Sequence, residues 1–159
     1  MNFRVGFGFD VHELREGLDF YLGGIKIDHK KGSYAHSDGD VLIHAICDAL
    51  LGAANLGDIG KHFPDTDPKY KGIDSKMLLR KVISLIDQQG FDIVNIDSTV
   101  CLQKPKIRLL IDRMQEVLSD CMKINTDLIS IKATTNEKLG FIGREEGVAA
   151  YATVLINKK

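Results

Sequence analysis

The order of strand-like and helical segments limits the possible folds of this chain more than any other feature of its sequence. Alternating apolar and β-branched residues predict strands, whereas apolar residues at helical spacing predict helices. The predicted strands cover residues 4–12, 20–27, 91–102, 128–134 and 148–156, and Gly23 with Gly24 predicts a bulge or bend in the second of them. The predicted helices run from a cap at Ser37 or Asp38 to about Asn55, from Asp74 to Gln89, and from Pro105 to Met122. This irregular alternation favours an α+β fold, mainly β-sheet with helices packed on one face in a ferredoxin-like arrangement.

The bulk properties of the chain exclude several classes of protein. Its length suits one domain, residues 1–159, and is too short for two. A net charge of -1 gives no general attraction to nucleic acid or to an anionic membrane. The three cysteines lack CxxC spacing, so neither a disulfide framework nor a thiolate zinc site is predicted. Without a membrane span or room for a signal peptide, we expect a cytoplasmic protein or a processed plastid form.

The first predicted strand carries two possible metal ligands inside an apolar run, FGFDVH. Residues two apart in a strand point to the same side, so Asp10 and His12 should project together while Phe9 and Val11 are buried on the other side. The ordinary alternative is an aspartate at a strand end that hydrogen-bonds a buried histidine. For an isolated D-x-H motif this alternative is favoured, because short motifs are weak signals.

A third possible ligand, His44, lies on the first predicted helix. Asp40 precedes it by four residues and Asp48 follows it by four, so the three side chains share one face of the helix. Two imidazoles and a carboxylate form the ligand set of a catalytic zinc site with an open fourth position, which predicts zinc on Asp10, His12 and His44. We expect Asp40 or Asp48 to hold the His44 ring from behind. Alternatively, both are solvated, and Asp40 only stabilises the helix N-terminus.

Other polar segments also suggest ligand binding. The loop over residues 57–72, GDIGKHFPDTDPKYKG, is too polar for a regular element, and loops of this length are usually functional or mobile. Residues 133–138, ATTNEK, follow a predicted strand and offer hydroxyl, backbone N–H and carboxylate groups for phosphate and magnesium, although a capping turn also explains them. Residues 103–106, QKPK, form a basic turn that solvation alone can explain, and Arg144 with Glu145 and Glu146 suggests a structural ion-pair cluster.

Four segments together resemble the 2-C-methyl-D-erythritol 2,4-cyclodiphosphate synthase family of the non-mevalonate isoprenoid pathway: GFDVH, AHSDGDVLIHAICDALLGAANLGDIGKHFPDTDP, KATTNEKLGF and GREEG. The resemblance covers nearly the whole chain. It implies a metal-dependent, cyclising lyase that converts 4-diphosphocytidyl-2-C-methyl-D-erythritol 2-phosphate into 2-C-methyl-D-erythritol 2,4-cyclodiphosphate and CMP. It also implies a homotrimer whose active sites lie between adjacent subunits.

The same resemblance implies roles for individual residues. The zinc ligands it implies, Asp10, His12 and His44, agree with the triad inferred from the residues. Glu137 would hold a second divalent ion, Mg2+ or Mn2+, between the two phosphates of the CDP unit, while His36 and Thr135 would stabilise the transition state. The expected methylerythritol pocket contains Ser37, Asp58, Phe63, Pro64, Asp65, Thr66 and Asp67, and Ile59 and Gly60 are also expected to bind substrate. The expected cytidine pocket contains Leu102, Gln103, Lys104, Pro105, Lys106, Ile107, Arg108 and Thr134. Further expected substrate-binding residues are Val11 and Asn136, with Phe141 and Arg144 near a central channel.

The chain lacks the GxSxG, Walker and GxGxxG motifs. Their absence fits a reaction in which the 2-phosphate of the substrate itself attacks the β-phosphate, because no protein nucleophile is then required. Two other functions fit the triad: a zinc-dependent phosphohydrolase that activates water, and a non-catalytic zinc- or nucleotide-binding module. A structural zinc normally has four protein ligands, and only three are evident here.

Overall fold

The computed structural model describes residues 2–159 and contains a five-stranded sheet, a two-stranded hairpin and three long helices. The strands are β1 (Phe3–Glu16), β2 (Phe20–Leu22), β3 (Ile25–Ile27), β4 (Lys31–Tyr34), β5 (Phe91–Cys101), β6 (Ile129–Thr134) and β7 (Gly147–Lys158). The long helices are α1 (Val41–Ala53), α3 (Ser75–Gln88) and α4 (Ile111–Met122), and the short ones are α2 (Ile59–His62), α5 (Gly140–Gly143), η1 (Pro68–Tyr70), η2 (Arg108–Leu110) and η3 (Thr126–Leu128). In this part of the chain, no helix is long and apolar enough to cross a membrane.

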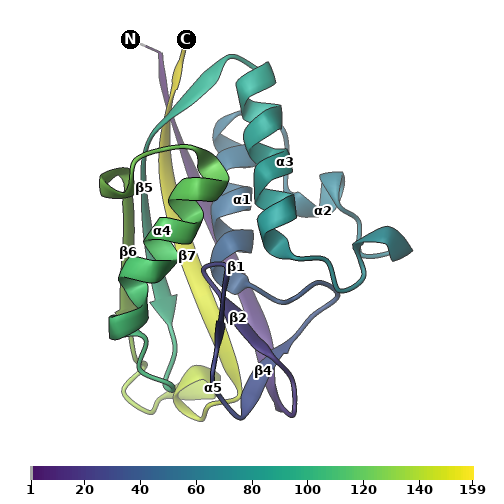
Figure 1. Cartoon of the computed structure of the whole chain (residues 1–159), viewed down its shortest axis with the longest axis vertical. Coiled ribbons are helices and arrows are strands. Elements are labelled where there is room, and N and C mark those ends of the chain that lie inside the picture. The colour runs from purple at the N-terminus through teal and green to yellow at the C-terminus, as the bar shows by residue number, and fades with distance from the viewer. Residues whose placement is uncertain (1) are drawn as a thin grey trace.

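The five strands follow the order β4-β1-β7-β5-β6, and every neighbouring pair is antiparallel except β5 and β6 (Figure 1). Strands β1 and β7 pair from Phe3 opposite Asn157 to Glu13 opposite Gly147. A parallel pair needs a crossover connection, which α4 provides between β5 and β6. Because Phe3 lies opposite Asn157, the start of β1 and the end of β7 are side by side at one end of the sheet (Figure 1).

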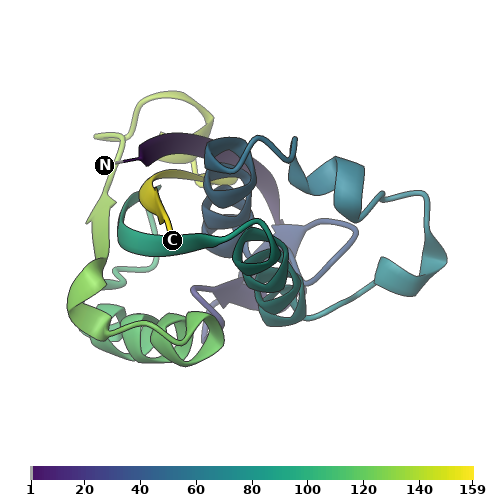
Figure 2. The ribbon, with the colours of Figure 1, turned by 90° about the horizontal axis from the view of Figure 1, so that it is seen from above.

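Helices α1, α3 and α4 lie on one side of the sheet (Figure 2). Helix α1 is buried at every position except Asp48 and Gly52, as expected for a helix that is apolar on nearly all sides. Gly6 and Gly8 of β1 face this helix, where a side chain would collide with its backbone carbonyl groups. The two glycines thus let α1 approach β1 closely, which brings the side chain of His44 next to the following residues of that strand.

The opposite face of the sheet is apolar along β1, and none of the three long helices covers it. The odd-numbered residues of β1 point to this face, where Val5 is 68% and Phe7 65% exposed. Phe9 and Val11 are 44% and 40% exposed, so the prediction that they are buried is wrong. The reason is that the helices pack against the glycine side of β1. Alternation in the sequence separates the two sides of a strand without showing which side is covered.

The structure confirms the α+β class and the packing of helices on one face, but not the ferredoxin-like arrangement. A ferredoxin-like chain has the order β-α-β-β-α-β, with two strands in succession between its helices. Here α3 and α4 are separated by β5 alone, and α4 leads into a parallel neighbour. The helical and strand patterns that identify the elements do not determine which strands become neighbours.

Three predicted element boundaries also change. The predicted strand over residues 20–27 is a hairpin, because Gly23 and Gly24 have φ angles of 59° and 78° and turn the chain. The cap of α1 is Asp40, whose side chain accepts a hydrogen bond from the backbone N–H of Ile43, rather than Ser37 or Asp38. The helix predicted from Pro105 begins as a single 3-10 turn at Arg108 and becomes α-helical at Ile111.

Candidate functional site

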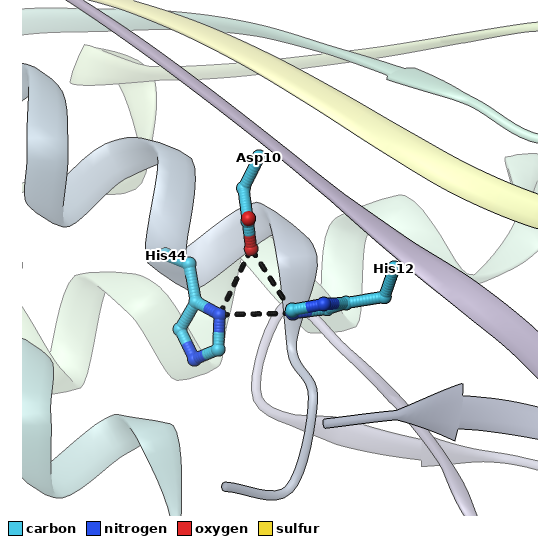
Figure 3. Close-up of side chains that lie close together, drawn as sticks. All are labelled: Asp10, His12 and His44. Carbon is cyan, nitrogen blue, oxygen red and sulfur yellow. Dashed lines mark hydrogen bonds and ion pairs between the residues drawn. The ribbon is translucent and has the colours of Figure 1, made fainter. Parts of the chain in front are cut away.

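Three side chains from β1 and α1 converge on one point (Figure 3). Oδ2 of Asp10 lies 2.9 Å from Nδ1 of His44 and 3.0 Å from Nε2 of His12, and the two nitrogens are 3.1 Å apart. Asp10 and His12 project together, as the two-residue period of a strand predicted, and His44 meets them from the helix. The structure thus brings the whole predicted triad together.

The donor set fits a metal ion. A tetrahedral ion with bonds of about 2.0–2.1 Å holds its ligand atoms about 3.3 Å apart, only a few tenths of an ångström more than the separations in this triad. The two nitrogens face each other across a shared carboxylate oxygen, where a positive charge is needed to stabilise the arrangement. Among residues 2–159, no other cluster of three or more histidine, cysteine or acidic side chains has a geometry that could hold a metal ion.

The electrostatics of Asp10 and His44 point the same way. Burial by itself raises the pKa of Asp10, but its hydrogen bonds and charge contacts with His12 and His44 outweigh burial and lower this pKa. For His44, burial lowers the pKa, while the contact with Asp10 outweighs burial and raises it. The contact between them therefore favours the ionised form of Asp10 and the protonated form of His44 in the absence of metal.

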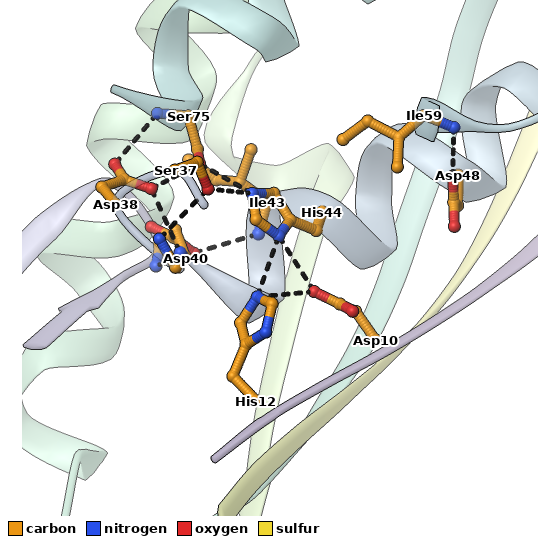
Figure 4. A network of polar contacts seen from close by, with 12 residues as sticks. Asp10, His12, Ser37, Asp38, Asp40, Ile43, His44, Asp48, Ile59 and Ser75 are labelled. Atoms are coloured by element: carbon orange, nitrogen blue, oxygen red, sulfur yellow. Dashed lines mark hydrogen bonds and ion pairs between the residues drawn. The ribbon is translucent and has the colours of Figure 1, made fainter. Parts of the chain in front are cut away.

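The partners behind His44 differ from those predicted (Figure 4). The carboxylate of Asp40 is fully buried and accepts hydrogen bonds from the backbone N–H groups of Gly23, Gly24 and Ile43. The carboxylate of Asp48 accepts one from the N–H of Ile59, at 2.7 Å. Neither carboxylate is hydrogen-bonded to His44, so that prediction is wrong: helical spacing placed them near the ring, but backbone donors occupy them.

Two serines lie at the other ring nitrogen of His44 instead. Nε2 of His44 is 2.9 Å from Oγ of Ser75 and 3.2 Å from Oγ of Ser37. The hydroxyl of Ser75 in turn donates to Oδ1 of Asp38, at 2.5 Å. The sequence predicts Asp38 only as a possible helix cap, and Ser75 only falls within the helix predicted from Asp74. Ser75 contacts both His44 and Asp38 across separate segments of the chain, so no local spacing could have identified these contacts.

A pocket of about 420 Å³ opens beside the triad. Its wall includes these residues of the expected site: Asp10, His12, His36, Ser37, His44, Ile59, Gly60, Phe63, Pro64 and Asp65. Other expected residues do not line it. Val11 points to the opposite face of the sheet, Asp58 caps α2 through the N–H of Lys61, and Asp67 caps the turn at Pro68 through the N–H of Lys69. Thr66 is also absent from the pocket wall.

A second, smaller pocket of about 120 Å³ lies at the ends of β5 and β6. It is lined by Leu102, Pro105, Lys106, Ile107, Arg108, Ala133, Thr134 and Thr135. The hydroxyl of Thr135 donates to Oε1 of Glu137 at 3.1 Å, so these two expected site residues lie together. Gln103 accepts a hydrogen bond from the N–H of Lys138, while Lys104 pairs with Glu145 at 3.0 Å. Asn136 belongs to the same turn, where its carbonyl accepts from the N–H of Leu139.

The two pockets are separated along the sheet. Asp10 pairs with Ala150, Ala150 with Val100, and Val100 with Ala133, so Asp10 and Ala133 are at the same level three strands apart. At about 4.8 Å between neighbouring strands, this register places their backbones about 14 Å apart. No residue lines both pockets.

Two residues are expected near a central channel: Phe141, which lies in α5, and Arg144, which directly follows it. Arg144 forms two hydrogen bonds with the carboxylate of Glu146, at 2.9 and 3.0 Å. This confirms part of the ion-pair cluster that the sequence suggested, because Glu145 pairs with Lys104 instead. Phe141 is 44% exposed. Their relation to a channel stays a prediction, because it depends on neighbouring copies of the chain.

Comparison with known proteins decides the family, because residues 3–157 match the model of the YgbB family. The chain belongs to the YgbB family. A relative from Bacteroides fragilis is 61% identical over 158 residues, or 99% of each chain, and one from Bacteroides thetaiotaomicron is 60% identical over the same length. Both are named 2-C-methyl-D-erythritol 2,4-cyclodiphosphate synthase. These YgbB-family relatives confirm the predicted resemblance and the predicted enzyme class.

Solved structures share the fold of this YgbB-family chain. The IspF–CDP complex of Plasmodium falciparum has a TM-score of 0.88 and 35% identity, with coverage of 99% of this chain and 97% of that one. The bifunctional IspDF of Campylobacter jejuni has a TM-score of 0.96 and 44% identity. Although that comparison includes 99% of the present chain, it spans only 43% of the Campylobacter chain.

Proposed function

We propose that this YgbB-family protein converts 4-diphosphocytidyl-2-C-methyl-D-erythritol 2-phosphate into 2-C-methyl-D-erythritol 2,4-cyclodiphosphate and CMP. In this reaction the 2-phosphate of the substrate attacks its β-phosphate, and CMP leaves. The observation that carries the proposal is the convergence of Asp10, His12 and His44 on the wall of a small-molecule pocket. Identity of 61% to a protein named for this synthesis supports the choice of reaction.

The metal proposed for the triad is zinc. Three protein ligands of nitrogen and oxygen type leave a fourth position open, which is the arrangement of catalytic zinc sites. A bound zinc ion would act as a Lewis acid toward phosphate oxygens. The chain contributes a carboxylate that stays ionised, through the lowered pKa of Asp10, and two rings whose ligand nitrogens already face that carboxylate.

Side chains around the triad would orient the methylerythritol part of the substrate. His36, Ser37 and Asp65 line the same pocket as the triad. Two unit charges 4 Å apart repel by about 4 kcal/mol at an effective dielectric of 20, so bringing two phosphate groups together requires hydrogen-bond donors and a fixed geometry. We assign these tasks to His36 and Ser37 as donors to phosphate, and to the Phe63–Asp67 loop as the wall that folds the substrate.

The smaller pocket would take the cytidine end of the substrate. Thr134 and the segment from Leu102 to Arg108 would surround the nucleoside, while Thr135 would donate to phosphate and Glu137 would hold Mg2+ or Mn2+. The Plasmodium relative was solved in complex with CDP, which supports a cytidine nucleotide as part of the substrate.

A complete site would then need two copies of the chain. Two metal ions acting on one phosphate group lie about 3.5–4 Å apart. By contrast, Asp10 of the triad and Ala133 of the second pocket, where Thr135 bonds Glu137, are about 14 Å apart across the sheet. A neighbouring copy can supply the second half. We therefore propose a homotrimer with sites between subunits, for which the exposed apolar face of the sheet offers a contact surface.

Phosphorus NMR of the products tests the proposal. The protein is incubated with the substrate, zinc and magnesium, and the proposal predicts resonances of the cyclic diphosphate and of CMP. Release of inorganic phosphate would instead identify a phosphohydrolase, and unchanged substrate would identify a binding module. Either of these two results contradicts the proposed function.

A further inference from the structure

We propose that Ser75, held by Asp38, is a positioning residue for the metal centre: it fixes His44 so that Nδ1 faces the metal. The inference rests on the proposed metal site and extends it to a residue outside the ligand set. Ser75 is fully buried at the start of α3, where its hydroxyl oxygen lies 2.9 Å from Nε2 of His44. Ser75 is therefore in direct contact with the back of a ligand ring (Figure 4).

The hydrogen-bond direction follows from the partners of Ser75. A hydroxyl group has one proton to donate, and the short contact of 2.5 Å to Oδ1 of Asp38 uses it, because an ionised carboxylate can only accept. The Ser75 oxygen must then accept from Nε2–H of His44. In the neutral ring that binds a metal, a proton on Nε2 leaves the free electron pair on Nδ1, the nitrogen that lies 2.9 Å from Asp10.

Asp38 is itself held firmly. Its Oδ2 accepts from the backbone N–H of Ser75 at 2.9 Å, and its Oδ1 also accepts from the N–H of Asp40 at 3.1 Å. These bonds connect the loop before α1 to the first residue of α3. The hydrogen bonds from Asp38 to Ser75 and from Ser75 to His44 thus connect three segments behind the metal site. Hydrogen-bond partners of this kind orient metal-binding histidines in proteins generally.

Ser37 is a second candidate partner for Nε2, but its geometry is weaker. Its hydroxyl oxygen is 3.2 Å from Nε2 and also accepts from the backbone N–H of Gly39. Ser37 lines the substrate pocket, so its hydroxyl is also available to a ligand. Ser75 is buried and does not line that pocket, so a ligand in the pocket would not compete for its hydroxyl group.

The test is zinc affinity without substrate, measured by competition with a chelator. Removing the hydroxyl in Ser75→Ala should weaken zinc binding by about 10–100-fold, the usual effect of losing a partner behind a ligand. Asp74→Ala is the matched control, because it removes the cap of the same helix one residue away without touching His44. Asp74→Ala should lower the melting temperature and change zinc affinity less than twofold.

Three results would overturn the inference: unchanged zinc affinity in Ser75→Ala, an equal loss in Asp74→Ala, or no zinc binding by the unmodified protein. The last would also remove the proposed metal site. If the unmodified protein binds zinc tightly and Ser75→Ala binds it more weakly, but no cyclic diphosphate forms, only the proposed function is refuted.

A second measurement covers the case that Ser75→Ala fails to fold. In the zinc-loaded unmodified protein with nitrogen-15-labelled histidine, NMR should show the His44 proton on Nε2, exchanging slowly with solvent. A proton on Nδ1 would overturn the inference.

Discussion

At the scale of single residues, Asp10 and His44 stabilise each other's charged forms in the metal-free protein. Their contact at 2.9 Å outweighs burial in both cases, lowering the pKa of Asp10 and raising that of His44. A divalent cation and the proton of His44 compete for the same place, because a metal ligand must be a neutral imidazole. The same Asp10–His44 contact therefore affects both metal binding and the pH dependence of stability.

We predict that the free energy of unfolding of the metal-free protein falls as the pH rises above about 6.5. His44, whose pKa is raised by Asp10, contributes stability that is complete below its unfolded pKa and is lost as the pH rises through its folded pKa. Asp10, whose pKa is lowered, contributes above about pH 4 and loses its contribution as the pH falls through its folded pKa. Urea unfolding in the presence of a chelator, repeated across the pH range, measures the loss of stability at high pH and at low pH. Asp10→Asn should abolish the fall at high pH, and a variant that keeps it contradicts the pairing.

A second prediction concerns the histidine itself. His44→Ala should lose zinc and reduce turnover by at least about 100-fold, because one of three ligands is gone. The metal-free variant should still fold, since the other side chains of α1 keep their packing. Metal analysis and product formation provide the measurements. His62→Ala is the control: that ring bonds the carbonyl of Leu56 outside the triad, and its removal should leave zinc content unchanged. Stoichiometric zinc in His44→Ala would exclude His44 as a ligand.

At the scale of elements, Asp40 ties the β2–β3 hairpin to the start of α1. Its carboxylate is fully buried and accepts from Gly23 and Gly24 in the hairpin turn and from Ile43 in the helix. Burial raises the pKa of this carboxyl group. The three donors would have no other partner in the described structure, so this side chain holds the element that carries His44 in place.

We predict that Asp40→Ala lowers the free energy of unfolding by about 3 kcal/mol or more, because buried N–H groups would lose their acceptor. Asp74→Ala, which removes a more exposed helix cap with one backbone donor, should cost only about 1 kcal/mol. Urea denaturation of both variants gives the comparison. Equal costs would show that Asp40 is no more than an ordinary cap.

Local patterns predicted the elements well and their surroundings poorly. The helix from Asp74 to Gln89 agrees with α3 to within a residue, because its cap and its apolar stripe are local features. The triad was predictable for the same reason, through a period of two on β1 and the helical placement of His44. The exposure of Phe9 and the contact of Ser75 with His44 were not predictable. Both depend on which segments meet in space, and no local period encodes that.

At the scale of the whole molecule, the chain exposes an apolar surface along β1 and places the triad and Thr135 in separate pockets. Phe7 and Phe9 of β1 pack against Tyr151 of β7, with ring centroids 6.3 and 5.0 Å apart. Exposed apolar patches of this kind usually mark contact surfaces. A second copy would bury this face and could bring a triad close to a Glu137 segment, so assembly and activity should be lost together.

Phe7→Glu tests this link. Phe7 is 65% exposed, so the charge should not disturb the core of one chain, but it should disfavour burial of the face in an oligomer. We predict a monomer by light scattering and loss of most product formation. Met77→Glu is the control, because Met77 is 57% exposed on α3, on the helix-covered side. A monomeric Phe7→Glu variant with full activity would contradict sites formed between copies.

The central claim is that the triad builds a metal site for cyclic diphosphate synthesis. Its most direct test is to add zinc stepwise to the metal-free protein, with magnesium and substrate present, and to follow the products by phosphorus NMR. The account predicts that the rate of cyclic diphosphate and CMP formation rises in proportion to the zinc bound, up to one ion per chain, with His44→Ala inactive throughout. Full-rate synthesis by the protein in excess chelator, or inorganic phosphate as the zinc-dependent product, would contradict it.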